Sequence, residues 1–415
     1  MKKRNVLYIA PVAPLAGSPH AGGQLAHYYV DKLNKNPAIA LKMLCYLPQS
    51  EIGLTQFADE GFDATYFFLE NESIVRKLYN RFDFNSYGFI ARRAITTIKR
   101  ILCDLKKTGY APDYVIFDWE QSSFLYSRIK TIWKHARYVV VEQDVLSQSL
   151  YRFYKNEKNL LFKVYRFYSY ITCTLLEKRV FSGIDEIVVL SHKDKVLIEN
   201  LGISSSKIRM IAPYFHDYEF VDINPVCDKT VVFLGYYKRI ENVEAVEWFV
   251  KTVLPLIPDC SLIIIGGGVS DSIQRLASDR VKITGFVSHA QIAKYFEESL
   301  CLVAPLFHGA GVKIKVLEAM LAGVPVLTNH IGIEGIDAAD RIEYFHCESA
   351  EDYARSINDL SRIVGLREQI GNNARLFINN HFDYRKSSYI ETGALANEHA
   401  YIVDMPFDQF KTTLK

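Results

Sequence analysis

The stretch LVAPLFHGAGVKIKVLEAMLAGVPVLTN, residues 302–329, contains the pattern that decides the fold. Its first apolar run, Leu302–Leu306, is typical of a buried strand. A loop with two glycines follows, then a helix that we expect to begin near Val312, and then a second apolar run at Val324–Leu327. This order predicts a strand–loop–helix–strand unit, the repeating unit of a parallel α/β sheet.

The beginning of the expected helix carries groups that suit a phosphate. Gly309 and Gly311 precede a helix end, where unpaired backbone N–H groups and a partial positive charge attract anions, and Lys313 and Lys315 add formal charge. Glu318 follows Gly311 by seven residues, two turns along nearly the same helix face. A carboxylate accepts hydrogen bonds from sugar hydroxyls but repels phosphate. The two features together predict a nucleotide-diphosphate sugar as the ligand.

The segment GAGVKIKVLEAM, residues 309–320, resembles the donor-site signature of the retaining GT-B glycosyltransferases of group 1, family 4 in the usual classification. That family often has two glutamates separated by seven residues. Glu318 matches the second, whereas Ala310 occupies the first position, and the Gly-rich loop with a basic residue is similar to a variant of the signature. The resemblance also covers residues 231–249, 262–268, 281–287 and 371–391. It is specific to the C-terminal half and generic before it.

The resemblance implies a GT-B fold, in which two Rossmann-like, doubly wound parallel-sheet domains face each other across a cleft. The length of 415 residues suits two domains. We expect an acceptor-binding domain at 1–220, a nucleotide-sugar-binding domain at 221–382, and a C-terminal helix and tail at 383–415 that return to the first domain. The stretch His216–Lys229 is the expected linker.

Apolar runs and periodicity predict the individual elements. Strands are expected at 6–12, 41–47, 114–120, 137–144, 186–191 and 207–215 in the first half, and at 231–234, 262–265, 281–284, 302–305 and 324–327 in the second. Helices are expected at about 25–34 and 74–108. Polar residues end several of these strands, at the edge where parallel sheets bind ligands.

The resemblance assigns donor-binding roles to several loops. The diphosphate contacts implied are Gly309, Ala310, Gly311, Val312 and Lys313, with Gly22 and Gly23 and a basic residue of YYKRIEN, either Lys238 or Arg239. The nucleoside or sugar contacts implied are Gly266, Gly267, His308, Glu318 and Glu334. The alternative for each glycine or charge is an ordinary turn or a solvated loop.

Residues of the first half are expected to meet the acceptor. Gln143 and Asp144 end a central strand, where related enzymes often carry a histidine at the place that Gln143 takes. We assign both to sugar or acceptor contacts and, with Lys313 and Glu318, to the catalytic set; the alternative is a structural strand end. His20 lies in the glycine loop and is the expected acceptor contact, with a surface position as its alternative.

The chain lacks the D-x-D motif by which metal-dependent glycosyltransferases of the other fold hold a divalent ion; the segment DWE at 118–120 is D-x-E. In a GT-B fold, cationic side chains take the place of that ion. We therefore expect no metal and no cofactor beyond the nucleotide-sugar co-substrate. The seven scattered cysteines, without a C-x-x-C pair, are typical of reduced core residues.

Hydropathy and charge indicate whether the chain spans or contacts a membrane. No apolar stretch approaches the ~20 residues that span a bilayer, so we expect a cytoplasmic chain. Lys and Arg outnumber Asp and Glu by 30 to 23 in residues 1–225, whereas 226–415 hold 19 and 24. The segment 151–170 has eight aromatic and five basic residues against one acid. These features are compatible with peripheral contact with an anionic membrane, or with an anionic or lipid-linked acceptor. The alternatives are solvated helices and, for 151–170, a core helix with polar edges; no nucleic-acid-binding pattern is present.

The resemblance thus implies a retaining glycosyltransferase of envelope polysaccharide synthesis that transfers a sugar to a glycan or lipid-linked glycan. Two other hypotheses stay open. Ala310 and Gln143 depart from frequent family patterns, which leaves open a catalytically silent GT-B subunit acting as a scaffold. A nucleotide-sugar epimerase or hydrolase on the same fold would consume donor without an acceptor.

Overall fold

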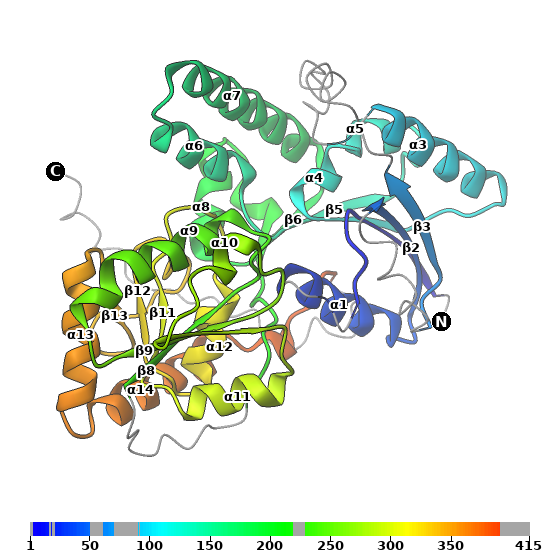
Figure 1. Ribbon diagram of the computed structural model, residues 1–415. Coiled ribbons are helices and arrows are strands. Elements are labelled where there is room, and N and C mark those ends of the chain that lie inside the picture. Colours follow the sequence, from blue (N-terminus) through cyan, green and yellow to red (C-terminus); the bar gives the residue numbers. More distant parts are fainter. Residues whose placement is uncertain are drawn as a thin grey trace.

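The computed structural model describes residues 3–15, 18, 21–49, 61–69, 90, 92–218 and 229–390 (Figure 1). The predicted acceptor contact His20 lies outside the described residues. The same holds for residues 74–89 and 91 of the predicted helix at 74–108, for 219–228 of the predicted linker at 216–229, and for 391–415 of the predicted C-terminal segment.

The first domain is built on a seven-stranded parallel sheet with the order β3-β2-β1-β4-β5-β6-β7. Its strands are β1 Arg4–Ala10, β2 Ile39–Pro48, β3 Ala64–Leu69, β4 Tyr114–Asp118, β5 Arg137–Glu142, β6 Glu186–Val189 and β7 Ile208–Met210. Its helices are α1 Ala21–Asn34, α3 Arg92–Lys107, α4 Glu120–Ser123, α5 Tyr126–Ile129, α6 Leu146–Asn156, α7 Leu160–Gly183 and α8 His192–Asn200. In Figure 1, α6 and α7 form a hairpin that extends from the top of this domain.

The second domain has a six-stranded parallel sheet with the order β10-β9-β8-β11-β12-β13. The strands are β8 Thr230–Leu234, β9 Ser261–Ile265, β10 Val281–Gly285, β11 Cys301–Ala304, β12 Val326–Thr328 and β13 Phe345–His346. The helices are α9 Ile240–Trp248, α10 Asp271–Gln274, α11 His289–Glu297, α12 Ile314–Leu321, α13 Ala350–Arg362 and α14 Leu366–His381. Two sheets of this kind confirm the predicted α/β fold of two doubly wound domains.

Each central strand is apolar throughout because helices cover both faces of its sheet. Along β8, Val231 and Phe233 pack into one core cluster, while Val232 between them packs into the cluster on the opposite face. Successive side chains of a strand point to opposite faces, so a strand between two helical layers needs apolar residues at every position. This is why the apolar runs at β8 and β11 could be predicted as strands from the sequence.

Two edge strands were not predicted. β3 is only half-buried along most of its length, and β13 contains two residues. A strand at a sheet edge buries less of its surface, so its sequence carries a weaker hydrophobic signal. Helix α12 begins at Ile314, two residues after the expected start.

The chain crosses between the domains and then returns. Ile211 still packs in the first domain, whereas Phe215 and Tyr218 pack in the second, so the crossing precedes most of the predicted linker. After α14, Tyr389 and Ile390 pack in the core of the first domain. Residues 384–386 form a 3₁₀ turn where a longer helix was expected. In the described part of the chain, no helix is both long and apolar enough to cross a membrane.

Candidate functional site

A cleft of about 470 Å³ lies between the two domains. Residues that follow β8, β9, β10 and β11 line it from the second domain, and residues of α1 and of the ends of β4 and β5 line it from the first. The carboxyl ends of parallel strands are where open α/β sheets bind ligands, because strands and loops diverge there and leave a crevice. The fold therefore brings most of the predicted site residues to one place.

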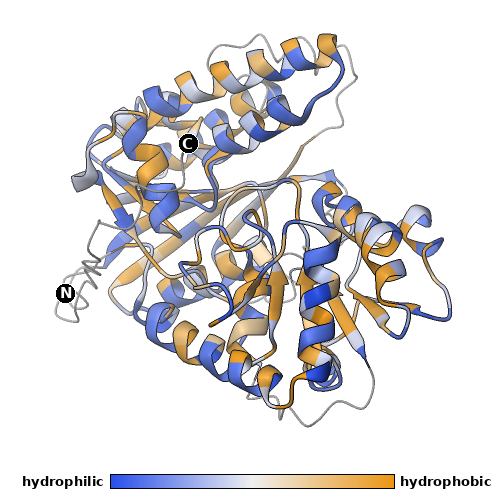
Figure 2. Cartoon of the chain, turned by 90° about the vertical axis from the view of Figure 1, so that its left-hand side faces the viewer, coloured by the Kyte–Doolittle hydropathy of each residue, from blue (hydrophilic) through white to orange (hydrophobic). Residues whose placement is uncertain are grey.

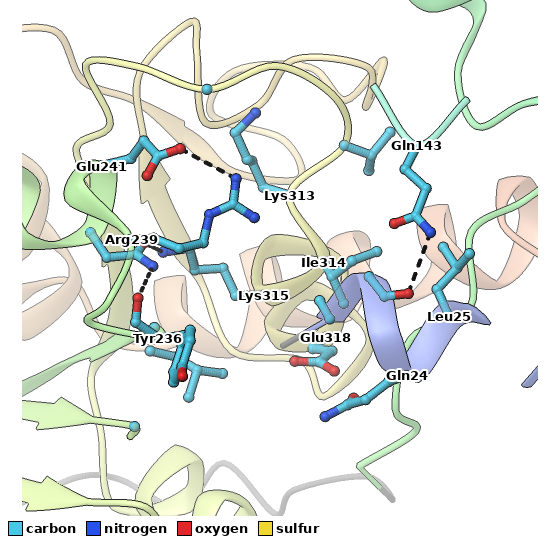
Figure 3. Close-up of a pocket in the computed structure, with 18 of the residues that line it drawn as sticks. Gln24, Leu25, Gln143, Tyr236, Arg239, Glu241, Lys313, Ile314, Lys315 and Glu318 are labelled. Carbon is cyan, nitrogen blue, oxygen red and sulfur yellow. Dashed lines mark hydrogen bonds and ion pairs between the residues drawn. The ribbon is translucent and has the colours of Figure 1, made fainter. Parts of the chain in front are cut away.

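Three cationic side chains line the side of the cleft that belongs to the second domain: Arg239, Lys313 and Lys315 (Figure 3). The Lys313 ammonium donates to the carbonyl oxygens of Gly311 at 2.6 Å and Ala310 at 3.3 Å, which holds it beside the glycine loop. The Lys315 ammonium donates to Asn242 Oδ1 at 2.7 Å and lies 4.5 Å from the centre of the Phe233 ring. The cluster is a site for an anion with several negative oxygens.

Burial lowers the pKa of both lysines, because a charged ammonium loses its hydration inside the cleft. The pKa of Lys313 falls to about 8, with Glu334 opposing the shift, and the pKa of Lys315 falls to about 7, with Lys313 and Arg239 adding repulsion. A bound diphosphate would restore the charge on both. The sequence indicated Lys315 as an added charge at this helix end but not as a ligand contact, and the structure places it in the lining of the cleft.

These pKa shifts predict that nucleoside diphosphate affinity falls as pH rises through about 7 to 8. Below that range both lysines of the free protein are charged, and above it they are neutral, so binding must then take up protons. The dissociation constant and proton uptake can be followed by calorimetry in buffers of different ionisation enthalpy. Lys315→Arg should flatten the profile, since a guanidinium stays charged. A flat profile in the unchanged protein would contradict the assignment.

The structure distinguishes the two basic candidates of the loop after β8. Arg239 lines the cleft and pairs with Glu241 at 3.2 Å, whereas Lys238 does not belong to the cleft lining. Arg239 also opposes the burial that raises the pKa of Asp144, a residue of the opposite domain. Arg239 therefore faces across the cleft, and Lys238 is its natural control.

The glycine loop before α12 lets the two domains approach closely. Gly309, Ala310 and Val312 line the cleft. Gly311 has φ +73°, and a Cβ atom there would lie 2.7 Å from the backbone oxygen of Gln143. A residue with a side chain is strained at that φ and would collide with the other domain. Glycine at this position is thus a condition for closing the cleft in this way.

Glu318 lies on α12 and faces the cleft between the two domains (Figure 3). It is 6% exposed, and its Oε1 accepts a hydrogen bond from the backbone N–H of His216 at 3.2 Å. Burial raises the pKa of this carboxyl to about 8. Apart from that bond its oxygens are directed at the space that a ligand would occupy, where hydroxyl donors could satisfy them.

The side of the cleft that belongs to the first domain has a different chemistry, made of amide, carboxyl and aromatic groups. Gln143 donates from Nε2 to Asp118 at 3.3 Å and to the Gly22 carbonyl at 3.4 Å, and Trp119 and Asp144 line the cleft beside it. Asp118 is fully buried and accepts from Tyr8, Gln143 and the Trp119 backbone N–H, and burial raises its pKa to about 6. Trp119 has φ 68°, a left-handed conformation that is uncommon outside glycine. This wall could bind hydroxyl groups and the face of a sugar ring.

Most of the other predicted contacts line the cleft, whereas Gly23 does not. His308, Gly266, Gly267 and Gly22 line the cleft. Gly22 and Gly23 belong to the first turn of α1, and Gly23 is buried and outside the lining. A Cβ atom at Gly22 would lie 2.5 Å from Gln143 Oε1 and 2.6 Å from a ring carbon of Trp119, so a side chain here would displace these two residues of the cleft.

Glu334 differs from its predicted role as a nucleoside or sugar contact, because it does not line the cleft. Its carboxylate forms two hydrogen bonds with Arg152 of α6, at 2.5 and 2.8 Å, and lies 3.5 Å from Lys193 of α8. The three residues tie the second domain to two helices of the first. The bidentate pair with Arg152 engages both oxygens of this carboxylate in a contact between the domains, outside the cleft lining.

Within the described residues, no group of three or more His, Cys, Asp or Glu is placed to hold a metal ion. The expectation of a metal-free mechanism stays a prediction.

Comparison with known proteins supports these features. Residues 228–362 match the family described as Glycosyl transferases group 1. A protein of Klebsiella pneumoniae, described as an uncharacterized 44.6 kDa protein in the cps region, is 25% identical over 288 residues, which are 66% of this chain and 72% of that protein.

Solved structures show the same architecture. Sucrose-phosphate synthase from Thermosynechococcus elongatus superposes with a TM-score of 0.64 at 14% identity, over 92% of this chain and 96% of that one. The Anabaena protein HepE, in complex with UDP and glucose, superposes with a TM-score of 0.64 at 13% identity over the same shares. Likeness at this level of identity establishes the fold.

Proposed function

We propose that this chain, whose residues 228–362 match the group 1 glycosyltransferases and whose fold is that of the GT-B enzymes, transfers a sugar from a nucleotide-diphosphate sugar with retention of configuration. The acceptor would be a hydroxyl of a glycan or lipid-linked glycan. The observation that carries the proposal is the cluster of Arg239, Lys313 and Lys315 at one cleft, opposite a wall of amide, carboxyl and aromatic groups. A diphosphate fits the first side and sugar hydroxyls fit the second.

The proposed reaction is a front-side displacement at the anomeric carbon. The bond from that carbon to the diphosphate oxygen breaks as the acceptor oxygen bonds to the carbon on the same face, and the leaving oxygen takes the acceptor proton. Negative charge grows on the diphosphate during this step. Arg239, Lys313, Lys315 and the N–H groups of the 309–312 loop would stabilise that charge, which lowers the barrier more than it strengthens ground-state binding.

The remaining residues would position the two sugars. Glu318 would form hydrogen bonds with donor hydroxyls, because its buried carboxyl group faces the cleft. Gln143 and Asp144 would contact the acceptor or the transferred sugar. Gln143 is oriented by Asp118 and Gly22, so its amide is held in one direction before a ligand binds.

A thermal-shift screen against UDP, GDP, ADP and CMP tests the donor site, because binding to the folded state raises the melting temperature by mass action. We expect a shift with one nucleoside diphosphate. Arg239→Ala should weaken that binding by about 10-fold or more, on the scale of a lost charge-assisted hydrogen bond, whereas Lys238→Ala should leave it unchanged. Equal effects of the two substitutions would contradict the geometry, and no shift with any nucleotide would favour the silent-subunit hypothesis.

Two observations leave open the hypothesis of a catalytically silent subunit. Ala310 occupies the first glutamate position of the family signature, and Gln143 occupies a place often held by histidine. A silent subunit would bind nucleotide weakly or not at all. An epimerase or hydrolase would instead consume donor in the absence of any acceptor, which product analysis separates from transfer.

The pathway and location are also part of the proposal. The similarity to a protein of the cps region supports a role in envelope polysaccharide synthesis. The surplus of positive charge in residues 1–225 supports peripheral contact with an anionic membrane, where a lipid-linked acceptor would lie.

A further inference from the structure

The outer surface of α7 exposes an unusual number of large apolar side chains. Of 18 such exposed side chains in the described part of the chain, eight lie on this helix. They are Leu160, Leu161, Phe162, Val164, Tyr165, Phe167, Ile171 and Leu175. Isolated exposed apolar residues are normal on a protein surface, but a concentration of them on one helix marks an interaction site. Figure 2 shows hydrophobic residues along this helix, at the top of the molecule.

Part of this set forms a continuous stripe. Leu161, Val164, Ile171 and Leu175 are spaced by three, seven and four residues, so they share one helix face, and they are 82%, 63%, 37% and 58% exposed. The stripe is about 21 Å long at the rise of an α-helix. The opposite face of α7 is buried, with Cys173, Leu176 and Val180 in the core of the first domain. A helix anchored on one face in the protein core can lie on a membrane but cannot span it.

The charges on α7 identify the partner. Its basic residues are Lys163, Arg166, Lys178 and Arg179, and its one acidic residue, Glu177, is fully buried. Every charge that α7 presents to solvent is therefore positive. A second copy of the chain would bring the same charges against them, whereas an anionic lipid surface attracts them. Lysine and arginine beside a strip of leucine and aromatic residues are typical of helices that bind in the interface of a bilayer.

The hairpin connects this surface with the cleft. Helix α6 packs along α7, its residues Leu146 and Ser149 line the cleft, and Phe153 stacks on His308 at 5.1 Å between ring centres. One helix of the hairpin thus forms the cleft wall and the other carries the apolar stripe. An acceptor held at a bilayer surface would lie next to the catalytic cleft.

We infer that the α6–α7 hairpin is a membrane-docking element, whose stripe at Leu161, Val164, Ile171 and Leu175 inserts among the lipids of an anionic bilayer while Lys178 and Arg179 meet the headgroups. This inference rests on the membrane part of the proposed function and identifies the surface that carries it. It does not depend on the donor site.

Vesicle sedimentation of the full chain tests the inference. We expect binding to phosphatidylcholine vesicles that contain phosphatidylglycerol, weaker binding at high salt, and little binding to phosphatidylcholine alone. The triple variant L161Q/V164Q/L175Q should lower the partition coefficient by about 10-fold or more, because each substitution removes apolar surface from the lipid. The variant K178E/R179E should lower binding to the anionic vesicles in particular.

The matched control is L256Q/I342Q/L376Q, which changes exposed apolar residues of the second domain and should bind vesicles as the unchanged protein does. All variants should keep the nucleotide thermal shift, which reports folding and the donor site independently. Absence of vesicle binding, or binding that the α7 substitutions leave unchanged, would overturn the inference. So would a concentration-dependent dimer that these substitutions dissociate, since the stripe would then belong to a second copy.

Discussion

Lys313→Ala is expected to lower kcat by about 100-fold or more, on the scale of losing one preorganised donor to a developing anion. The Lys313 ammonium is held beside the glycine loop by the carbonyls of Ala310 and Gly311, at the side of the cleft that we assign to the leaving diphosphate. Its interaction grows as negative charge moves onto that group, so kcat should fall more than the donor KM rises. Steady-state release of nucleoside diphosphate measures both.

The stability of the variant separates this catalytic effect from misfolding. Burial lowers the pKa of Lys313 to about 8, which means that the fold disfavours the charged ammonium. Its removal should therefore not lower the melting temperature of the unliganded protein appreciably. Lys313→Arg keeps the charge and should retain more turnover than alanine. Full turnover in Lys313→Ala would remove this residue from the catalytic set.

Gly311→Ala is expected to lower kcat/KM by about 100-fold, through the position of the two domains rather than through a lost contact. The new Cβ atom would lie 2.7 Å from the backbone oxygen of Gln143 and 2.9 Å from Asp144 Cβ, both in the first domain. The backbone at the end of a buried strand cannot move far enough to relieve this collision, so we expect the two domains to separate instead. Nucleotide should still bind to the second domain, while transfer should fail because the side of the cleft that belongs to the first domain is displaced.

Gly365→Ala is the matched control. Gly365 has φ +78°, close to the +73° of Gly311, but no atom lies within 4 Å of the position its Cβ would occupy. Both substitutions therefore impose the same backbone strain, about 1–2 kcal/mol, and only one creates a collision between domains. The control should melt at a lower temperature yet keep its kcat/KM. If the two variants lost activity equally, domain approach at Gly311 would not be the cause.

Some features of the site could be predicted from the sequence because they depend on residues that are close together along the chain. The glycine loop, Lys313 and Glu318 belong to one short segment, where helix geometry alone relates their positions. The strands at the centre of each sheet could be predicted because burial on both faces requires apolar residues at every position. Edge strands β3 and β13 lack that requirement and were missed.

Other features depended on contacts between distant parts of the chain. The choice between Lys238 and Arg239 follows from the direction in which one loop leaves β8, and neighbouring residues of the same charge carry no signal for that. Glu334 looked like a ligand contact until Arg152, 182 residues earlier, proved to pair with it. Lys315 entered the cleft because α12 turns it toward Asn242 and Phe233.

The fold class and its two parallel sheets follow from hydrophobic periodicity, and the grouping of the glycine loop, Lys313 and Glu318 follows from their closeness along the chain, so both were predictable from the sequence. The tertiary structure decided which cations face the cleft, which acid pairs across the domains, and which face of α7 stays uncovered. Those outcomes depend on side chains brought together from opposite ends of the chain, and their energies are not encoded in any local pattern.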